Sequence, residues 1–375
     1  MLKVGITGQA GFIGTHLHNF LNLKKEEIIT VPFEDNYFEN SEKLRKFVSE
    51  CDAIVHLAAL NRHGDPQVIY DTNLKLVKQL IDALEATHSR PHVLFSSSIQ
   101  EERDNLYGKS KRDGRLLLSD WADRNQARFS GFVIPNVFGP FGNPYYNSVI
   151  ATFSHQLTHS EQPGIDVDAT LRLIYVGELT DLFYRKIKEQ ATAPFTATIH
   201  VDYTSENKVS EILSLLENYK KVYIENYSFP EINSTFEQNL FNTFRSYIDQ
   251  KTRYPVLLKK NHDQRGVFIE SVKTATGGQF SFSTTVPGIT RGNHFHTRKI
   301  ERFIVIKGKA VIELRRIGTT EILRFELDGE NPSFVDMPVW YSHNITNVGD
   351  DELLTLFWIN ELYNPDDPDT FFEKV

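Results

Sequence analysis

The first half of the chain alternates short apolar runs with segments of helical periodicity. The runs that predict buried strands are residues 2–7, 53–57, 92–95 and 129–134. The segments that predict helices, from apolar side chains at three- and four-residue spacing, are residues 13–23, 72–86 and 110–123. Regular strand–helix alternation predicts an α/β fold with a doubly wound parallel sheet and right-handed crossovers.

The pattern changes after a further helical stretch that ends near residue 250. Short runs with two-residue alternation then follow one another, separated by Gly, Pro and Asp. These runs are residues 266–270, 279–285, 301–307, 310–315, 321–326 and 353–359. They predict an all-β sandwich or small barrel. We therefore place a domain boundary near residue 252, which gives domains 1–252 and 253–375.

Composition restricts the classes of function. The chain has 375 residues, and its 41 Lys and Arg against 49 Asp and Glu, a net charge of −8, argue against nucleic-acid binding. No apolar run approaches the roughly 20 residues needed to span a bilayer, so we expect no membrane insertion. A single cysteine, Cys51, excludes an internal disulfide, and a first strand at residue 2 leaves no room for a signal peptide. We therefore expect a cytoplasmic protein.

A glycine-rich motif directly follows the first predicted strand. The run Thr-Gly-Gln-Ala-Gly-Phe-Ile-Gly, residues 7–14, contains Gly8, Gly11 and Gly14 and opens the first predicted helix. In a Rossmann-type unit such glycines permit a tight turn, close approach of the backbone to a pyrophosphate, and close helix–strand packing. The alternative is an ordinary strand–helix turn that uses glycine for a positive φ. The position between a strand and a helix favours a dinucleotide site.

Tyr107 and Lys111 are four residues apart, so on a helix they share one face. A cation beside a phenol favours the phenolate, and lowering the pKa of a phenol from about 10 to about 7 requires roughly 4 kcal/mol. The pair would often mark a solvated helix face. Three serines at residues 96–98 raise its value, because they follow a strand where ligands bind in open α/β sheets.

Together these motifs resemble the extended short-chain dehydrogenase/reductase (SDR) family that acts on nucleotide sugars. The resemblance also includes His-Leu-Ala-Ala at residues 56–59 and Tyr-Val-Gly-Glu at residues 175–178. It implies that Tyr107 is the general acid/base and that Lys111 activates it. It also implies that the hydroxyl of Ser98, or alternatively of Ser97, hydrogen-bonds the reacting oxygen.

The same resemblance implies a nicotinamide cofactor. The residues implied to bind it are Gly8, Gly11, Phe12, Ile13, Gly14, Leu57, Ala58 and Lys111. Asn61 and Arg62 either line the nicotinamide side or are ordinary loop residues, and Asn136 is implied to contact the substrate. The most similar members use NADPH, whereas Glu34 and Asp35 after the second strand fit the free ribose hydroxyl of NADH. We predict NADPH, with NADH as the alternative.

A second group of residues with metal-ligand chemistry lies in the β-rich half. His294 and His296 point the same way from a strand, and Glu301 follows five residues later. His343 lies on a later predicted strand. Three imidazoles and a carboxylate inside a small barrel suit Zn, Mn, Fe or Ni, and we predict one divalent ion, zinc. A histidine pair alone would more often be structural or lie on the surface.

The spacing of these residues resembles the two metal-binding motifs of the cupin family and implies a cupin barrel. The second motif usually has a glycine where this chain has Trp340, whose bulk is expected to narrow the barrel mouth. Residues 263–270, Asp-Gln-Arg-Gly-Val-Phe-Ile-Glu, resemble a segment of cupin-fold sugar-nucleotide 3,5-epimerases. That resemblance implies that Arg265 and Glu270 contact nucleotide or substrate, and the alternative is an ion pair at a strand edge.

An extended SDR domain followed by a metal-binding cupin resembles the bifunctional capsular-polysaccharide enzymes of CapF type over the full chain. Matching stretches are residues 96–100, 146–153, 288–294 and the tail motif 364–370, Asn-Pro-x-x-Pro-Asp-Thr. The resemblance implies metal-dependent C3 epimerisation of UDP-2-acetamido-2,6-dideoxy-hexos-4-ulose in the cupin. Reduction of the C4 ketone in the SDR domain would then give UDP-2-acetamido-2,6-dideoxy-L-talose, on the route to UDP-N-acetyl-L-fucosamine.

The chemistry of such a substrate fits both groups of residues. The C3 proton is acidic only because C4 is a ketone, so a cation that stabilises the enolate favours its removal. The residue that moves this proton is left open between Tyr341, His262 and a metal ligand that dissociates. A homodimer is expected, because extended SDRs often pair through a four-helix interface. The alternatives are a monofunctional 4-ketoreductase with a structural cupin and a non-catalytic sugar-nucleotide-binding scaffold.

Overall fold

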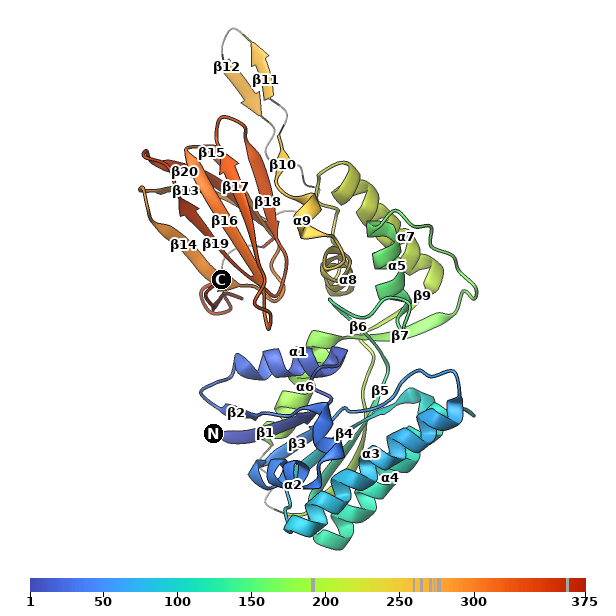
Figure 1. The fold of residues 1–375 in the computed structure, drawn as a ribbon. Helices are drawn as coiled ribbons and strands as arrows, with labels where there is room; N and C mark the ends of the chain where they lie inside the picture. The colour runs from blue at the N-terminus through green and yellow to red at the C-terminus, as the bar shows by residue number, and fades with distance from the viewer. Residues whose placement is uncertain are drawn as a thin grey trace. The chain divides into compact units, whose positions relative to one another are not determined.

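The computed structural model describes residues 1–189, 193–258, 260–263, 266–269, 272, 274, 278–361 and 364–375, with backbone alone at 260–263 and 266–269. The chain packs as two compact units, drawn in Figure 1. The first unit consists of Met1–Val149 and Ala169–Lys208, and the second of Ile150–Asp168 and Val209–Val375. Each unit contains its own buried apolar core, so each is described by itself.

The first unit is built on a six-stranded sheet of order β2-β1-β3-β4-β5-β8, in which every neighbouring pair is parallel. Its strands are β1 (Leu2–Thr7), β2 (Ile28–Val31), β3 (Ala53–His56), β4 (His92–Ser98), β5 (Arg128–Ile134) and β8 (Phe195–His200). Its α-helices are α1 (Phe12–Asn22), α2 (Ser41–Glu50), α3 (Pro66–Thr87), α4 (Leu106–Asn125) and α6 (Val176–Lys188). A second sheet contains β6 (Asn136–Phe138), β7 (Thr170–Tyr175) and β9 (Ser205–Lys208). The predicted doubly wound parallel sheet is confirmed.

Helices cover both faces of the six-stranded sheet (Figure 1). α2, α3 and α4 pack on one face, where Leu44, Val77 and Leu118 join one apolar core. α1 and α6 pack on the other face through Leu17 and Phe183. Strands buried on both faces are apolar along their whole length, which explains the continuous runs in the sequence. Because the strands are parallel, the carboxyl ends of β1, β3 and β4 share one edge, where open α/β sheets bind ligands.

Helix α4 begins four residues earlier than the apolar pattern predicts. The side chain of Asn105 caps the helix by accepting a hydrogen bond from the Gly108 N–H at 2.7 Å. A Cβ on Gly108 would lie 1.8 Å from the carbonyl oxygen of Gln100, so glycine is required for this close packing. Tyr107 therefore lies in the first turn of α4, against the segment that follows β4, and Lys111 lies one turn later.

The second unit contains two five-stranded sheets of antiparallel strands, of order β10-β18-β15-β20-β13 and β17-β16-β19-β14-β21. Their strands are β10 (Val256–Leu257), β13 (Gln279–Thr285), β14 (Thr290–Phe295), β15 (Glu301–Lys307), β16 (Lys309–Arg316), β17 (Ile322–Asp328), β18 (Ser333–Met337), β19 (Tyr341–Asn347), β20 (Leu353–Ile359) and β21 (Phe371–Phe372). A separate hairpin pairs β11 (Lys260–Asp263) with β12 (Gly266–Ile269). Ile304 and Phe334 from one sheet and Ile312 from the other share one core. The β architecture predicted for the sequence after residue 252 is confirmed.

Helices also belong to the second unit. They are α5 (Val149–Thr158), α7 (Val209–Tyr219), α8 (Thr235–Arg245) and α9 (Gln250–Arg253), with a π-helical turn at Lys220–Glu225. The Tyr223 and Tyr254 hydroxyls donate to the buried carboxylate of Asp336, whose Oδ1 lies 2.7 Å from Nε of Arg302 on β15. The compact units therefore do not divide at residue 252, where helical sequence gives way to strands, because the helices before it pack with the barrel.

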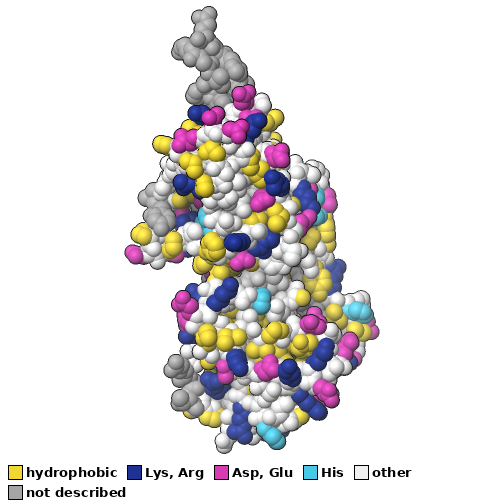
Figure 2. All heavy atoms as spheres, turned by 60° about the vertical axis from the view of Figure 1, so that its left-hand side comes forward, with side chains coloured by type: hydrophobic (Ala, Val, Ile, Leu, Met, Phe, Trp, Pro, Cys, Tyr) yellow, Lys and Arg dark blue, Asp and Glu magenta, His cyan; other side chains and the backbone are white. Residues whose placement is uncertain are grey.

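The described surface carries charges of both signs. Figure 2 shows Lys and Arg side chains interspersed with Asp and Glu over the face in view. The expectation of no nucleic-acid partner rests on the net charge of −8 and stays a prediction. Within the described part of the chain, no helix combines the length and the apolar character that crossing a membrane requires.

Candidate functional sites

The glycine motif forms a compact turn between β1 and α1. Gly8 has a φ of +69°, and a Cβ there would lie 2.8 Å from the backbone of Ala58. A Cβ on Gly14 would lie 2.2 Å from the carbonyl oxygen of Gly8, so the helix packs directly on the turn. No side chain caps α1 at Gly11, and its first turn contains no acidic residue. The N–H groups at this helix end, including those of Phe12 and Ile13, suit a pyrophosphate.

The end of β3 lies against the same turn. The Leu57 N–H donates to the Thr7 carbonyl at 3.2 Å, and the Ala58 N–H donates to Thr7 Oγ1 at 3.4 Å. Thr7 Oγ1 also lies 2.6 Å from Nδ1 of His56. Burial, aided by the nearby Lys111 charge, lowers the pKa of His56 to about 3, so this ring is neutral. The structure thus brings the predicted cofactor residues of the glycine motif and of β3 together.

The ammonium group of Lys111 is buried behind Tyr107. Its Nζ donates to the Ser96 carbonyl at 3.1 Å and lies 5.9 Å from the centroid of the Tyr107 ring. Burial lowers the pKa of Lys111 to about 8. Burial, together with the neighbouring Tyr146, raises the pKa of Tyr107 to about 12.

The expectation that Lys111 lowers the pKa of Tyr107 is therefore not met by the chain alone. Burial and the neighbouring Tyr146 both disfavour the phenolate, and Lys111 is itself buried, with a lowered pKa. Bringing the Tyr107 pKa from about 12 to near neutrality would require about 7 kcal/mol, more than the roughly 4 kcal/mol expected from sequence. At neutral pH Tyr107 is a phenol and hence a proton donor.

The serines at the end of β4 have different partners. The Ser97 hydroxyl donates to Glu101 Oε2 at 2.6 Å, and Glu101 is paired with Arg115 at 3.0 Å. The Ser98 hydroxyl accepts a hydrogen bond from the Gln100 N–H at 3.2 Å. An accepted hydrogen bond leaves the hydroxyl proton available to a ligand. Ser98 therefore suits the role of donor to a reacting oxygen better than Ser97.

Asn61 and Arg62 hold a segment beside the tyrosine. Arg62 Nη1 donates to the Tyr146 carbonyl at 3.0 Å, and the Asn61 carbonyl accepts from Asn147 Nδ2 at 3.5 Å. Tyr146 contributes to the raised pKa of Tyr107 and so lies near it. These contacts tie Asn61 and Arg62 to the segment that contains Tyr146, and their place beside the nicotinamide stays a prediction.

One buried residue of this site escaped the sequence analysis. Asn73 of α3 accepts from the Leu60 N–H at 2.7 Å, and its amide donates to the Leu60 carbonyl at 3.1 Å and to Ser110 Oγ at 3.0 Å. It ties the loop after β3 to α4 between Tyr107 and Lys111. The sequence could have indicated this residue, because Asn73 is a polar side chain at a core position of the helix predicted over residues 72–86. Asn136, by contrast, is exposed at the start of β6, and its side chain donates to the carbonyl of a β7 residue.

In the second unit, a bulge in β14 directs two of the predicted metal ligands. The pairing of β14 with β19 shifts between Gly292 and His294, and Gly292 has a φ of +98°. A Cβ on Gly292 would lie 2.8 Å from the carbonyl oxygen of His343. Beyond the bulge His294 is paired with His343, and their ring centroids are 4.5 Å apart.

The four predicted ligands converge. One ligand atom from each of His294, His296, Glu301 and His343 lies within 4.8 Å of the others. Glu301 Oε2 lies 2.9 Å from His296 Nε2 and 3.2 Å from His343 Nε2. Despite this proximity, these three buried atoms form no hydrogen bond of acceptable geometry. Buried polar atoms that converge without hydrogen bonds fit the ligands of a cation, and the donor set suits zinc.

The electrostatics of this cluster agree with a cation site. Burial disfavours the Glu301 carboxylate, but His296 and His343 together hold the pKa of Glu301 well below its usual range. Burial and the adjacent rings lower the pKa of His294 to about 4. Burial likewise opposes charge on His296, yet Glu301 raises the pKa of that ring. The cluster therefore keeps an anionic carboxylate facing nitrogen donors.

Trp340 connects the two cupin-like motifs. Trp340 has a φ of +61°, a backbone conformation that favours glycine. This conformation explains why the second cupin motif usually has a glycine here. The backbone N–H of Trp340 donates to the His296 carbonyl at 2.8 Å. The indole ring stacks on Phe295, with ring centroids 5.4 Å apart. Phe295 alternates with the two histidines and points to the opposite face of β14. The indole thus packs on the face of β14 that points away from the ligand cluster, and the narrowing of the barrel mouth stays a prediction.

Tyr341 is two residues from His343 on β19, so the two side chains face the same side of the sheet. Its carbonyl accepts a hydrogen bond from His343 Nδ1 at 3.2 Å, and burial raises the pKa of its phenol. Arg265, Glu270 and the side chain of His262 lie outside the described residues, and their roles stay predictions.

Known proteins match both units. Residues 4–197 match the NAD dependent epimerase/dehydratase family, and residues 261–371 match the polysaccharide biosynthesis C-terminal domain. The chain is 32% identical over 372 residues to a UDP-2-acetamido-2,6-beta-L-arabino-hexul-4-ose reductase from Pseudomonas aeruginosa, covering 99% of this chain and 98% of that protein. Its sequence is 34% identical to that of the capsular polysaccharide assembling protein CapF from Staphylococcus aureus, whose crystal structure is known. The two chains match over their full lengths, with a TM-score of 0.63. RMD from Pseudomonas aeruginosa, solved with NADPH, covers 66% of this chain and 99% of its own at 19% identity and a TM-score of 0.56, and shows the fold alone.

Proposed function

The chain belongs to the NAD dependent epimerase/dehydratase family and, over its full length, to the CapF-type capsular-polysaccharide enzymes, and from this premise we propose a bifunctional nucleotide-sugar enzyme. Its substrate is UDP-2-acetamido-2,6-dideoxy-hexos-4-ulose, which is epimerised at C3 and then reduced at C4 to UDP-2-acetamido-2,6-dideoxy-L-talose. The name of the Pseudomonas aeruginosa relative, a reductase of a UDP-linked 4-keto sugar, supports this substrate class. We assign reduction to residues 1–252 and epimerisation to residues 253–375.

The single observation that carries the proposal is the presence of two donor sets on one chain. The first is the Tyr107–Lys111 pair beside Ser98, next to the glycine turn. The second is the cluster of three imidazoles and one carboxylate with ligand atoms within 4.8 Å of one another. A carbonyl reductase alone has no use for the second set.

In the first site, Tyr107 donates its proton to the C4 oxygen as the ketone is reduced. Ser98 donates a hydrogen bond to the same oxygen, and Lys111 places positive charge behind the phenol, 5.9 Å from the ring centroid. The glycine turn and the N-terminus of α1 hold the pyrophosphate of the cofactor, which when bound supplies the hydride. We propose NADPH, and parallel assays with NADH test that choice.

In the second site, His294, His296, Glu301 and His343 would hold one divalent ion, for which we propose zinc. When bound, such an ion is a Lewis acid that stabilises negative charge on a carbonyl oxygen. Removal of the C3 proton leaves its electron pair delocalised onto the C4 oxygen, and return of a proton to the opposite face of C3 completes the epimerisation. The residue that moves this proton stays open between Tyr341, whose side chain faces the same side of β19 as that of His343, His262 and a metal ligand that dissociates.

The order of the two steps follows from the ketone. The C3 proton is acidic only while C4 is a carbonyl, so epimerisation precedes reduction, and reduction fixes the configuration at C3. One observation favours the alternative that the cluster has a structural role. Three of its members are buried away from solvent: His296, Glu301 and His343 are 3%, 8% and 0% exposed. His294, however, is only partly buried, which leaves the cluster a side from which a ligand can approach.

The proposal is tested with the purified, metal-loaded protein, the UDP-linked 4-keto sugar and NADPH. We expect one equivalent of NADPH to be oxidised per sugar and the talo product, inverted at C3, to be identified by NMR. If C4 is reduced but the C3 configuration is unchanged, the protein is a ketoreductase and its barrel is structural. No NADPH oxidation would leave only a binding protein.

A further inference from the structure

We propose that Asp369, in the C-terminal segment 364–372, is a positioning residue of the barrel's metal centre, holding both the His296 ring and the turn that joins His296 to Glu301. The inference rests on the metal centre proposed above. It gives a role to the tail motif at residues 364–370, which neither proposed reaction uses.

The Asp369 carboxylate is almost fully buried and is occupied by the turn between β14 and β15. Its Oδ1 accepts from the Thr297 N–H at 3.0 Å and from the Thr297 hydroxyl at 2.6 Å. Its Oδ2 accepts from the N–H groups of Arg298 and Lys299, each at 2.9 Å. Four hydrogen bonds to one carboxylate fix the turn more firmly than neutral partners would. Residues 297–299 are the whole of this turn before Ile300, so its shape sets the distance between His296 and Glu301.

The backbone of the same residue holds the ligand itself. The Asp369 carbonyl lies 2.5 Å from His296 Nδ1, and because a carbonyl can only accept, Nδ1 carries the proton. In the neutral ring, Nε2 is then the nitrogen whose lone pair can bind a cation, and it is this atom that lies 2.9 Å from Glu301 Oε2. Asp369 has a φ of +41°, unusual for a residue other than glycine, and in this conformation its carbonyl and carboxylate both face the turn. A metal-binding histidine is commonly oriented by such a bond from its other nitrogen.

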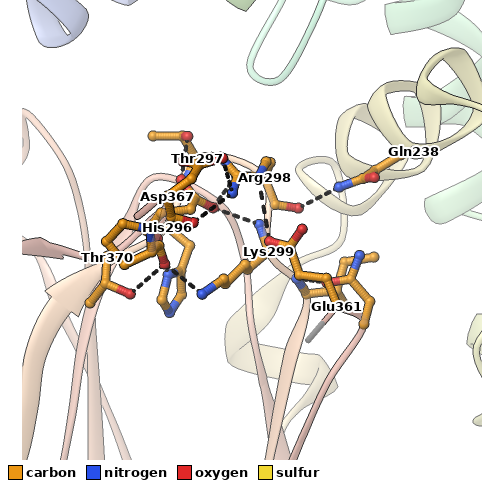
Figure 3. A network of polar contacts seen from close by, with 12 residues as sticks. Gln238, His296, Thr297, Arg298, Lys299, Glu361, Asp367 and Thr370 are labelled. Atoms are coloured by element: carbon orange, nitrogen blue, oxygen red, sulfur yellow. Dashed lines mark hydrogen bonds and ion pairs between the residues drawn. The ribbon is translucent and has the colours of Figure 1, made fainter. Parts of the chain in front are cut away.

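The rest of the segment fastens Asp369 in place. Phe371 and Phe372 form β21, which pairs with Phe295 and His294 of β14. Before Asp369, Asp367 pairs with Arg298 at 2.8 Å, but this ion pair is exposed to solvent and so stabilises the segment little. Figure 3 shows Asp367 and Thr370 of the tail beside the turn that contains Thr297, Arg298 and Lys299.

Helix α8 reaches the turn from the other side. Gln238 Nε2 and Asn242 Nδ2 both donate to the Arg298 carbonyl, at 3.0 and 3.1 Å, and Figure 3 shows Gln238 extending from the helix. The turn is therefore held by the tail through its N–H groups and by α8 through a carbonyl. Loss of the Asp369 contacts would free the N–H side alone, leaving the helix contact and all four ligands in the chain.

The test compares Asp369→Asn with Asp367→Asn, the same change two residues away on a side chain that is 64% exposed. The amide of Asp369→Asn keeps the shape but sets an NH2 group against N–H donors. Apo protein is titrated with Co(II) against a competing chelator, and the visible spectrum of bound Co(II) is recorded. We expect Asp369→Asn to weaken Co(II) binding by about 10–100-fold and to change the spectrum, because the carboxylate that fixes the turn also keeps the Asp369 carbonyl on the His296 ring. Asp367→Asn should bind within about twofold of the wild type.

Wild-type affinity and spectrum in Asp369→Asn would overturn the inference. If that variant fails to fold, Thr297→Val decides, because it removes one hydrogen bond to Asp369 and keeps the side-chain shape. We expect it to weaken Co(II) binding by about threefold or more, and unchanged binding would equally overturn the inference. Failure of the wild-type protein to bind Co(II) would instead refute the metal centre itself, so the two failures are distinguishable.

Discussion

Each of the two sites buries one charged group, and burial disfavours charge at both, yet only the barrel group keeps a pKa that favours its charged form. Lys111 is 3% exposed and has the Ser96 carbonyl as its partner, so its pKa falls to about 8. Glu301 is 8% exposed, yet two imidazoles hold the pKa of Glu301 well below its usual range. The difference lies in the partners, because two ionisable rings face the Glu301 carboxylate, whereas the Lys111 ammonium donates to a neutral carbonyl. In the reductase site, the ammonium behind the proton donor therefore loses its charge at a lower pH than an ordinary lysine does. In the barrel site, the carboxylate that faces the nitrogen donors stays ionised.

The largest effect should come from removing the proton donor of the first site. Tyr107→Phe deletes the only atom that can protonate the C4 oxygen in the proposed mechanism. We expect reduction, measured as NADPH oxidation, to fall by about 1,000-fold. Proton exchange at C3 should be unchanged. A variant that retains more than a tenth of the wild-type rate would contradict the role of Tyr107.

The reciprocal change is in the barrel. Glu301→Gln keeps the shape of the side chain but removes the anion that faces His296 and His343. We expect exchange at C3 to fall by about 100-fold or more, since an outer partner of a ligand is already worth about 10–100-fold. NADPH oxidation with a sugar already inverted at C3 should stay within about twofold. Equal loss of both activities would show that the sites are not chemically separate.

A smaller effect distinguishes the two serines of β4. Ser98→Ala should slow reduction by roughly 30-fold, the equivalent of about 2 kcal/mol for one hydrogen bond to a charged oxygen. Ser97→Ala should cost only a few-fold, because the Ser97 hydroxyl already donates to Glu101. The two kcat values, measured with NADPH in excess, settle the order. A larger loss in Ser97→Ala would reverse the assignment.

The pH dependence of reduction should follow the charge of Lys111. The pKa of Lys111 is lowered to about 8, so its charge is fully present below that value and is lost as pH rises through it. We expect kcat/KM for reduction to be level between pH 6 and 7.5 and to fall about tenfold per unit above pH 8. A profile that stays level to pH 9.5 would show that the ammonium is not required.

Much of both sites could be predicted because regular structure fixes spacing. Gly8 and Gly14 lie at a strand–helix junction, Tyr107 and Lys111 are one helical turn apart, and His294 and His296 obey the strand period. These relations are local, so the periodicity of the chain is enough to place them. The metal cluster also needed His343 from another strand, which a specific motif supplied.

The rest depends on contacts between distant parts of the chain. Asn73 acts on Leu60 and Ser110, and Asp369 acts on a turn about 70 residues earlier, so neither role follows from local pattern. The raised pKa of Tyr107, to about 12, depends on burial, which spacing does not report. The start of α4 was placed four residues late because the apolar pattern carries no sign of the Asn105 cap.

The most direct measurement of the central claim is solvent exchange at C3 without a nicotinamide cofactor. Metal-loaded wild-type protein is incubated in D2O with the UDP-linked 4-keto sugar, and C3 deuteration is followed by NMR. If the barrel and the sheet handle one ketone independently, deuterium enters C3 with no NADPH present and does so equally in Tyr107→Phe. Deuterium that enters only when NADPH is added, or that still enters in Glu301→Gln at the wild-type rate, would contradict the account.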